Sequence, residues 1–160
     1  YSVLVLSVCA LPALADVNIV GNVAAKCIIQ TDTGGVYGNP TATKLSTLPA
    51  DGGVVPIVRY DVAVANYYTA KITHPSAFSS SPSLSDTVAW TGASSVAQTS
   101  VAGMAAYDAA KVVYGSTTNF NLTIAGSTWF KTASTATYGV SKAFPGGSYT
   151  AIVQAECIAN

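Results

Sequence analysis

Residues 16–27 form the stretch that most restricts the fold of this chain. Polar side chains such as Asn18, Asn22 and Lys26 occupy its even positions. Its odd positions are apolar or small: Val17, Ile19, Gly21, Val23, Ala25 and Cys27. Alternation with a period of two predicts a β-strand with one face ready for burial. The strand is therefore either an edge of its own sheet or a strand donated to another chain.

The chain closes on a second alternating segment, residues 148–158. Its odd positions are Tyr149, Ala151, Val153, Ala155 and Cys157. Cys157 thus lies on the more apolar face of its strand, as Cys27 does on the opening strand. The shared phase favours a Cys27–Cys157 disulfide, which an oxidising compartment would permit. Two lone cysteines and one histidine do not make a zinc site, and the sequence predicts no cofactor.

Residues 1–15 have the composition of a secretory leader that lacks its first residues. The apolar run 3–11 suits an h-region, and Ala13-Leu14-Ala15 fits the small-x-small cleavage rule. Cleavage would remove Cys9 and leave Cys27 and Cys157 as an even pair in a secreted protein. The alternative is that Tyr1 begins an ordered apolar strand.

Charged residues make up 9% of the chain, and the formal net charge is zero. Such a composition supplies no basic surface for nucleic acid. A neutral surface with few charges also does little to keep copies of the same chain apart. The composition therefore favours a protein that assembles.

Between the two ends we expect short strands and no long helix. Residues 61–73 look like one strand whose alternation slips near Asn66, as at a bulge. Residues 119–125 and 128–133 look like a hairpin around Gly126-Ser127, and 87–91 like a short strand. The expected fold is all-β: a single antiparallel β-sandwich.

The sequence predicts no enzyme. His74 is the single histidine, and because it lies in a serine-rich loop we expect it at the surface. The seven carboxylates are scattered, and the glycine doublets lie at turns. Trp90, Trp129 and the tyrosines could line a sugar site, although packing is the commoner role of such residues.

The two ends of the chain resemble those of chaperone–usher pilins, the subunits of bacterial fimbriae. The resemblance lies in Val17-x-Ile19-x-Gly21-x-Val23 leading to Cys27, and in the segment from Pro145 to Val153. It implies an incomplete immunoglobulin-like sandwich over residues 27–160, preceded by a donor strand over 16–26. Val17, Ile19, Gly21 and Val23 would fill the groove of a neighbouring subunit, which Tyr149, Ala151 and Val153 would border.

The resemblance also implies the partners and the location. Identical subunits would join head to tail in a cell-surface fimbria, after secretion through the periplasm with a chaperone and an outer-membrane usher. The chain departs from the type 1 pattern, because the segment before Cys27 is short and Cys157 lies far along the chain. Gly21 has an alternative role, a bulge in the subunit's own first strand. An alternative function is a secreted adhesin or coat module that binds carbohydrate or another surface, through Trp90, Trp129 or the loop 76–83.

Overall fold

The computed structural model describes residues 19, 21, 26–101, 117–140 and 142–160. In these residues the regular structure is β, apart from the short 3-10 helix η1 (Pro49–Asp51). The strands are β1 (Cys27–Thr33), β2 (Gly38–Thr41), β3 (Lys44–Ser46), β4 (Ile57–Val62), β5 (Tyr68–Thr73), β6 (Val88–Thr99), β7 (Thr117–Leu122), β8 (Gly126–Tyr138) and β9 (Gln154–Ala159). Their pairings are antiparallel, so the predicted all-β class is confirmed.

The larger sheet is built around the long strand β8. One edge of β8 pairs with β6 along nearly its whole length. The other edge is shared between two strands. Residues 126–131 of β8 pair with β4, and residues 135–137 pair with β3. β4 continues to β1 and β3 continues to β2, which gives six strands in all. The smaller sheet has the order β7-β5-β9.

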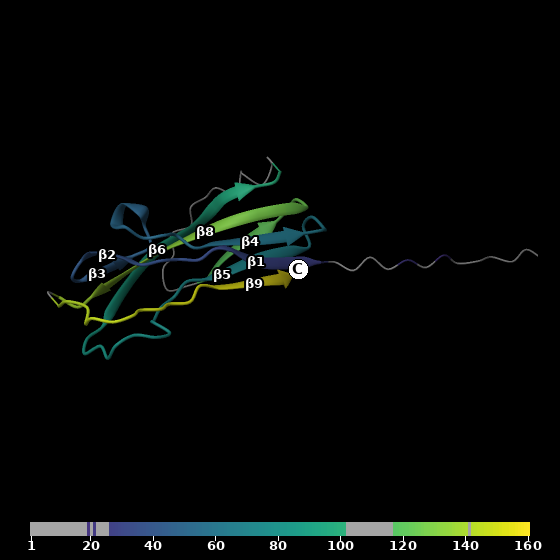
Figure 1. Ribbon diagram of the computed structural model, residues 1–160. Coiled ribbons are helices and arrows are strands. Elements are labelled where there is room, and N and C mark those ends of the chain that lie inside the picture. The colour runs from purple at the N-terminus through teal and green to yellow at the C-terminus, as the bar shows by residue number, and fades with distance from the viewer. Residues whose placement is uncertain (1–18, 20, 22–25, 102–116, 141) are drawn as a thin grey trace, which may run out of the picture.

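The two sheets pack face to face, an arrangement consistent with a β-sandwich (Figure 1). Inward residues alternate along the strands, so β5 and β7 bury every second side chain. The rings of Phe120 on β7 and Phe130 on β8 meet across the interface with centroids 4.6 Å apart. Tyr60 on β4 packs edge-on against Phe130, and its hydroxyl donates a hydrogen bond to the Lys71 carbonyl of β5. These contacts close the core around the middle of the two sheets.

The prediction of one strand over residues 61–73 was wrong. β4 ends at Val62 in the larger sheet, and β5 begins at Tyr68 in the smaller one. Asn66 has φ 59°, the left-handed conformation that asparagine tolerates better than most residues. The slip in alternation at Asn66 therefore marks a turn between sheets and not a bulge within a strand.

The predicted hairpin around Gly126-Ser127 was also wrong. Both strands exist, but β7 pairs with β5 in the smaller sheet, whereas β8 pairs with β4, β6 and β3 in the larger sheet. The short loop crosses between sheets, and Gly126 has φ 137°, which L side chains rarely adopt. The predicted short strand at 87–91 is the first part of the twelve-residue β6.

Candidate functional site

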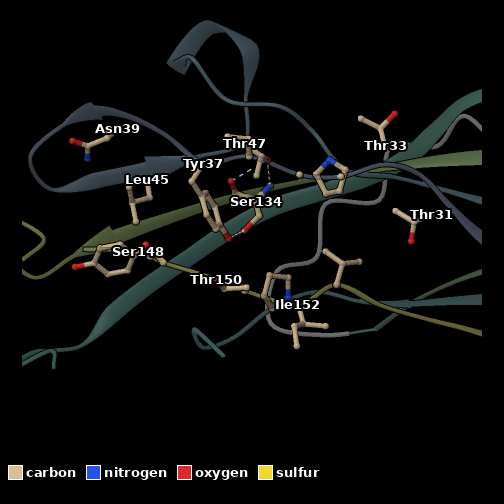
Figure 2. A pocket seen from close by; sticks show the side chains of 18 of the residues that line it. Thr31, Thr33, Tyr37, Asn39, Leu45, Thr47, Ser134, Ser148, Thr150 and Ile152 are labelled. Atoms are coloured by element: carbon tan, nitrogen blue, oxygen red, sulfur yellow. Dashed lines mark hydrogen bonds between the residues drawn. The ribbon is translucent and has the colours of Figure 1, made fainter. Parts of the chain in front are cut away.

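A groove with a volume of about 730 Å³ runs along the seam between the two sheets. One wall is the chain from Thr31 to Tyr37, at the end of β1 and beyond it. The facing wall is residues 147–153, which lead into β9. We call this cavity the seam groove; Figure 2 shows Thr31, Thr33 and Tyr37 on one side and Ser148, Thr150 and Ile152 on the other.

The floor of the seam groove is apolar. Leu45 of β3 is buried, and Val58 of β4 is half-buried beside Pro56 and Pro75. At the rim, the apolar side chains of Val36 and Ile152 are 54% and 57% exposed. None of the described residues that line the groove is charged. An apolar, uncharged occupant suits this lining.

A small hydroxyl network lies within the groove. The Tyr37 hydroxyl and the Ser134 hydroxyl are 3.0 Å apart, and the Ser134 backbone N–H donates to Thr47 Oγ1 at 2.9 Å. Thr47 Oγ1 in turn donates to the Ser134 carbonyl (Figure 2). Burial raises the pKa of Tyr37, so its hydroxyl stays protonated at ordinary pH. The network fixes the Tyr37 ring in the wall of the groove.

Each wall includes a stretch of open backbone, although Val36 on one wall and Thr150 on the other are paired. Among the described residues β1 pairs with β4 on one edge, and its other edge faces the seam. On the facing wall, Ser79 and Ser80 hold Thr150 by backbone hydrogen bonds of 2.7 to 3.3 Å. No backbone hydrogen bond joins Ala151, Ile152 or Val153 to another described residue. Backbone groups in such a position are usually paired, so the groove can accept an extended chain between its walls.

The disulfide Cys27–Cys157 closes one end of the seam, as the sequence predicted. It joins β1 to β9 with a Cα–Cα distance of 6.5 Å. These strands lie side by side near the C-terminus in Figure 1. β1 starts at this bridge and runs toward the groove, so Lys26, which precedes β1, lies at the end of the strand away from the groove.

The structure places the predicted site residues in two groups. Tyr149, Ala151 and Val153 line the seam groove, and their half-burial alternates with exposed neighbours. The strand predicted over 148–158 is regular from Gln154, and its earlier part is extended with one bridge between Thr150 and Ser80. Of the predicted donor residues, Ile19 is 97% exposed, and a Cβ on Gly21 would meet nothing within 4 Å. Val17 and Val23 lie outside the described residues.

We compared the chain with protein-family models, curated proteins and solved structures. No family model, curated protein or solved structure matches it. In the described part of the chain, no three His, Cys, Asp or Glu side chains gather as a metal site. No helix there is long and apolar enough to cross a membrane.

The expectation of a surface His74 was wrong. Its side chain is 3% exposed, and its Nε2 lies 3.3 Å from Ser94 Oγ and 3.4 Å from Thr118 Oγ1. Ser94 is fully buried, so solvent does not reach this serine–histidine pair. A hydrolase needs a serine that a substrate can reach, and this pair instead belongs to the packing between the sheets.

The two tryptophans predicted as sugar-site candidates lie apart. Trp129 faces outward from β8, where its Nε1 donates to Asp32 and the Arg59 guanidinium lies 5.7 Å from its ring. Trp90 of β6 contacts Phe78 of the serine-rich loop, with ring centroids 4.7 Å apart. The structure therefore brings Trp90 to the loop 76–83 and leaves Trp129 on another surface.

Sequence reasoning missed the wall from Val36 to Tyr37 and the groove residue Ser134. Gly34-Gly35 before Val36 and Gly38-Asn39-Pro40 after Tyr37 indicated turns, which concealed the apolar pair between them. The two adjacent apolar residues were the one signal that could have revealed this wall. No sequence pattern pointed to Ser134, because its role depends on the gap along β8 between the residues that pair with β4 and those that pair with β3.

Proposed function

We propose that this chain is the structural subunit of a secreted surface filament of the chaperone–usher pilin kind, without catalytic activity. In this proposal residues 27–160 form an immunoglobulin-like sandwich that lacks one strand, and residues 17–23 of another copy complete it. The observation that supports the proposal is the seam groove, an uncharged cavity between the outer edge of β1 and the extended residues 151–153, whose backbone makes no hydrogen bond to another described residue. A β-strand is the occupant that satisfies both its apolar floor and its backbone edges.

The proposed occupant matches the groove in length and charge. The wall from 147 to 153 has as many residues as the proposed donor 17–23, and seven extended residues span roughly 23 Å. Both stretches are free of charged side chains. Burying Val17, Ile19 and Val23 would contribute about 1.5–3 kcal/mol for each fully buried side chain, before the cost of ordering the strand.

Donation to another copy is favoured over folding back. Cys27, where the proposed donor segment joins β1, lies at the disulfide end of the strand, whereas the groove lies beyond the other end. Reaching its own groove would require this segment to reverse direction and pass the bridge. When each copy donates at one end and accepts at the other, the contact is heterologous and propagates as a filament.

The partners proposed for the unassembled subunit follow from the same open edges. Exposed apolar side chains and unpaired strand edges promote unwanted pairing between chains. A periplasmic chaperone would cover the groove until an outer-membrane usher delivers the subunit to the growing fimbria.

The proposal is tested by single substitutions in the donor segment. Ile19→Asp places a carboxylate on the face that should enter the groove, whereas Asn18→Asp places it on the opposite face. Secreted Ile19→Asp protein should stay monomeric, and Asn18→Asp protein should form filaments in electron micrographs. Deletion of residues 16–23 should act like Ile19→Asp.

Filaments that persist after the deletion would defeat the proposal. If the Ile19→Asp and Asn18→Asp proteins assembled equally well, the proposed orientation of the donor strand, with its odd positions in the groove, would be wrong. An adhesin function is the second candidate, since Trp90 meets the serine-rich loop at a separate surface. Binding on a glycan array without filaments would favour that function.

A further inference from the structure

A second hollow lies beside the serine-rich loop and shares no lining residue with the seam groove. Its volume is about 490 Å³, and it is lined by residues 76–78 and 81–84 together with Val88 and Trp90 of β6. Trp90 lies opposite Ala136 of β8 in the sheet, so its backbone is held by regular pairing. This hollow, which we call the Trp90 hollow, thus has one wall on a sheet and one on a loop.

The floor of the Trp90 hollow is aromatic and held in place. The ring of Phe78 lies 4.7 Å from that of Trp90 and 5.1 Å from that of Tyr149, between centroids. Tyr149 packs in turn on Phe144, which stacks on Tyr138 of β8. Phe78 is therefore fixed from behind, and it shares a half-buried apolar floor with Leu84, Val88 and Trp90.

The rim has a different chemistry from the floor. Ser76, Ser81 and Ser83 are exposed around the opening. A serine hydroxyl can donate one hydrogen bond and accept others, and that of Ser81 already donates to the Pro82 carbonyl, so it is left to accept. The residues that line this hollow include no charged side chain. A phosphate, carboxylate or ammonium group would find no counter-charge there. A ligand of this hollow should instead be neutral, with an apolar face and several hydroxyls.

We propose that the Trp90 hollow binds a neutral pyranoside sugar. The C–H face of the ring would lie on the aromatic floor of Trp90 and Phe78, and the sugar hydroxyls would exchange hydrogen bonds with the serine rim. An aromatic wall combined with a few polar groups is the usual composition of a small-molecule site. The proposal does not depend on the seam groove, because the two cavities share no lining residue.

The fluorescence of Trp90 gives a direct readout. The chain has two tryptophans, so a Trp129→Phe protein reports on Trp90 alone. We would titrate it with methyl β-glucopyranoside, methyl β-galactopyranoside and N-acetylglucosamine. At least one should change the emission saturably. Sorbitol, an open-chain polyol without a ring face, should not.

Two variants separate binding from folding. Trp90→Ala removes the aromatic floor and should weaken binding about tenfold, measured by saturation-transfer NMR. Ala77→Arg instead fills the opening from an exposed loop position and leaves the aromatic rings intact. Its matched control is Ala89→Arg, an exposed position of β6 beside Trp90 on the other face of the strand. Ala77→Arg should abolish binding, and Ala89→Arg should leave it unchanged.

The proposal is overturned if none of the three pyranosides binds saturably. It is overturned equally if the folded Ala77→Arg protein binds as tightly as Ala89→Arg. If sorbitol gave a saturable response as large as that of the pyranosides, the hollow would recognise hydroxyls alone. The proposed contact between the sugar ring face and the aromatic floor would then be wrong.

Discussion

The imidazole of His74 is enclosed by hydroxyl groups from both sheets. Its Nε2 approaches Ser94 of β6 and Thr118 of β7, and Ser94 also contacts Thr132 of β8 at 3.0 Å between hydroxyl oxygens. His74 itself follows β5. This one residue therefore links strands of the larger sheet to strands of the smaller one.

Burial lowers the pKa of His74 below its ordinary value of 6.5. The unfolded chain thus binds the proton more tightly than the folded chain, and stability should fall as the pH drops below about 6.5 until the folded pKa is reached. Urea unfolding between about pH 5 and about pH 8 should show this slope in the native protein. His74→Gln should flatten it, because the chain has no other histidine. Identical slopes in the two proteins would contradict the prediction.

At the residue scale, the sequence revealed the types of side chain but not all of their surroundings. Cys27 and Cys157 could be paired because their strands alternate regularly, and phase alone brought both to the same kind of face. His74 could not be placed, since its neighbours are serines and prolines typical of a loop. The hydroxyls that surround it come from β6, β7 and β8, and those contacts depend on the packing of two sheets.

Among the elements, the β2–β3 pair and the chain from the end of η1 to Gly53 approach each other unusually closely. A Cβ on Gly53 would lie 2.2 Å from the Ser46 carbonyl oxygen, and one on Gly38 would lie 2.1 Å from that of Asp51. Backbone atoms cannot move aside as a flexible side chain does. This approach holds the Val36–Val54 bridge beside the seam groove.

Gly53→Ala should therefore destabilise the protein by about 1–3 kcal/mol, the usual cost of overpacking. Gly34→Ala is the matched control, because a Cβ there would meet nothing within 4 Å. Urea titrations of the two variants should show a lower midpoint for Gly53→Ala and nearly no change for Gly34→Ala. A similar midpoint in both would mean that the turn after η1 adjusts without cost.

At the element scale, alternation predicted where strands occur better than which sheet they join. β7 and the start of β8 were each predicted from their own residues, yet their adjacency along the chain suggested a hairpin that does not form. Phe120 and Phe130 explain why: both rings point into the core from opposite sheets, and a crossing at Gly126 lets them meet. Local sequence does not distinguish such a crossing from a hairpin turn. The seam groove was likewise expected only through resemblance, because its walls come from the two ends of the chain.

At the scale of the whole molecule, the disulfide encloses most of the chain. It joins residues separated by 130 positions and encloses every strand from β1 to the middle of β9. In the chain-entropy model so long a loop contributes roughly 4–5 kcal/mol to the free energy of unfolding.

A Cys27→Ala/Cys157→Ala protein should consequently unfold at a markedly lower urea concentration. The double variant leaves neither partner of the bridge as an unpaired thiol, and reduction of the native protein with dithiothreitol should lower its midpoint by a similar amount. Midpoints that agree in all three samples would show that the unfolded chain is already constrained without the bridge.

The position of that bridge also has a mechanical consequence for the proposed filament. A pulling force would enter each subunit through the residues before Cys27 and leave it through the walls of the seam groove. At Cys27 the load divides at once between β1 and, through the covalent sulfur bridge, β9, which leads into the facing wall. In the proposed filament, both sides of the seam would then share the tension, which would shear the inserted strand along its length and would not peel one wall away from it.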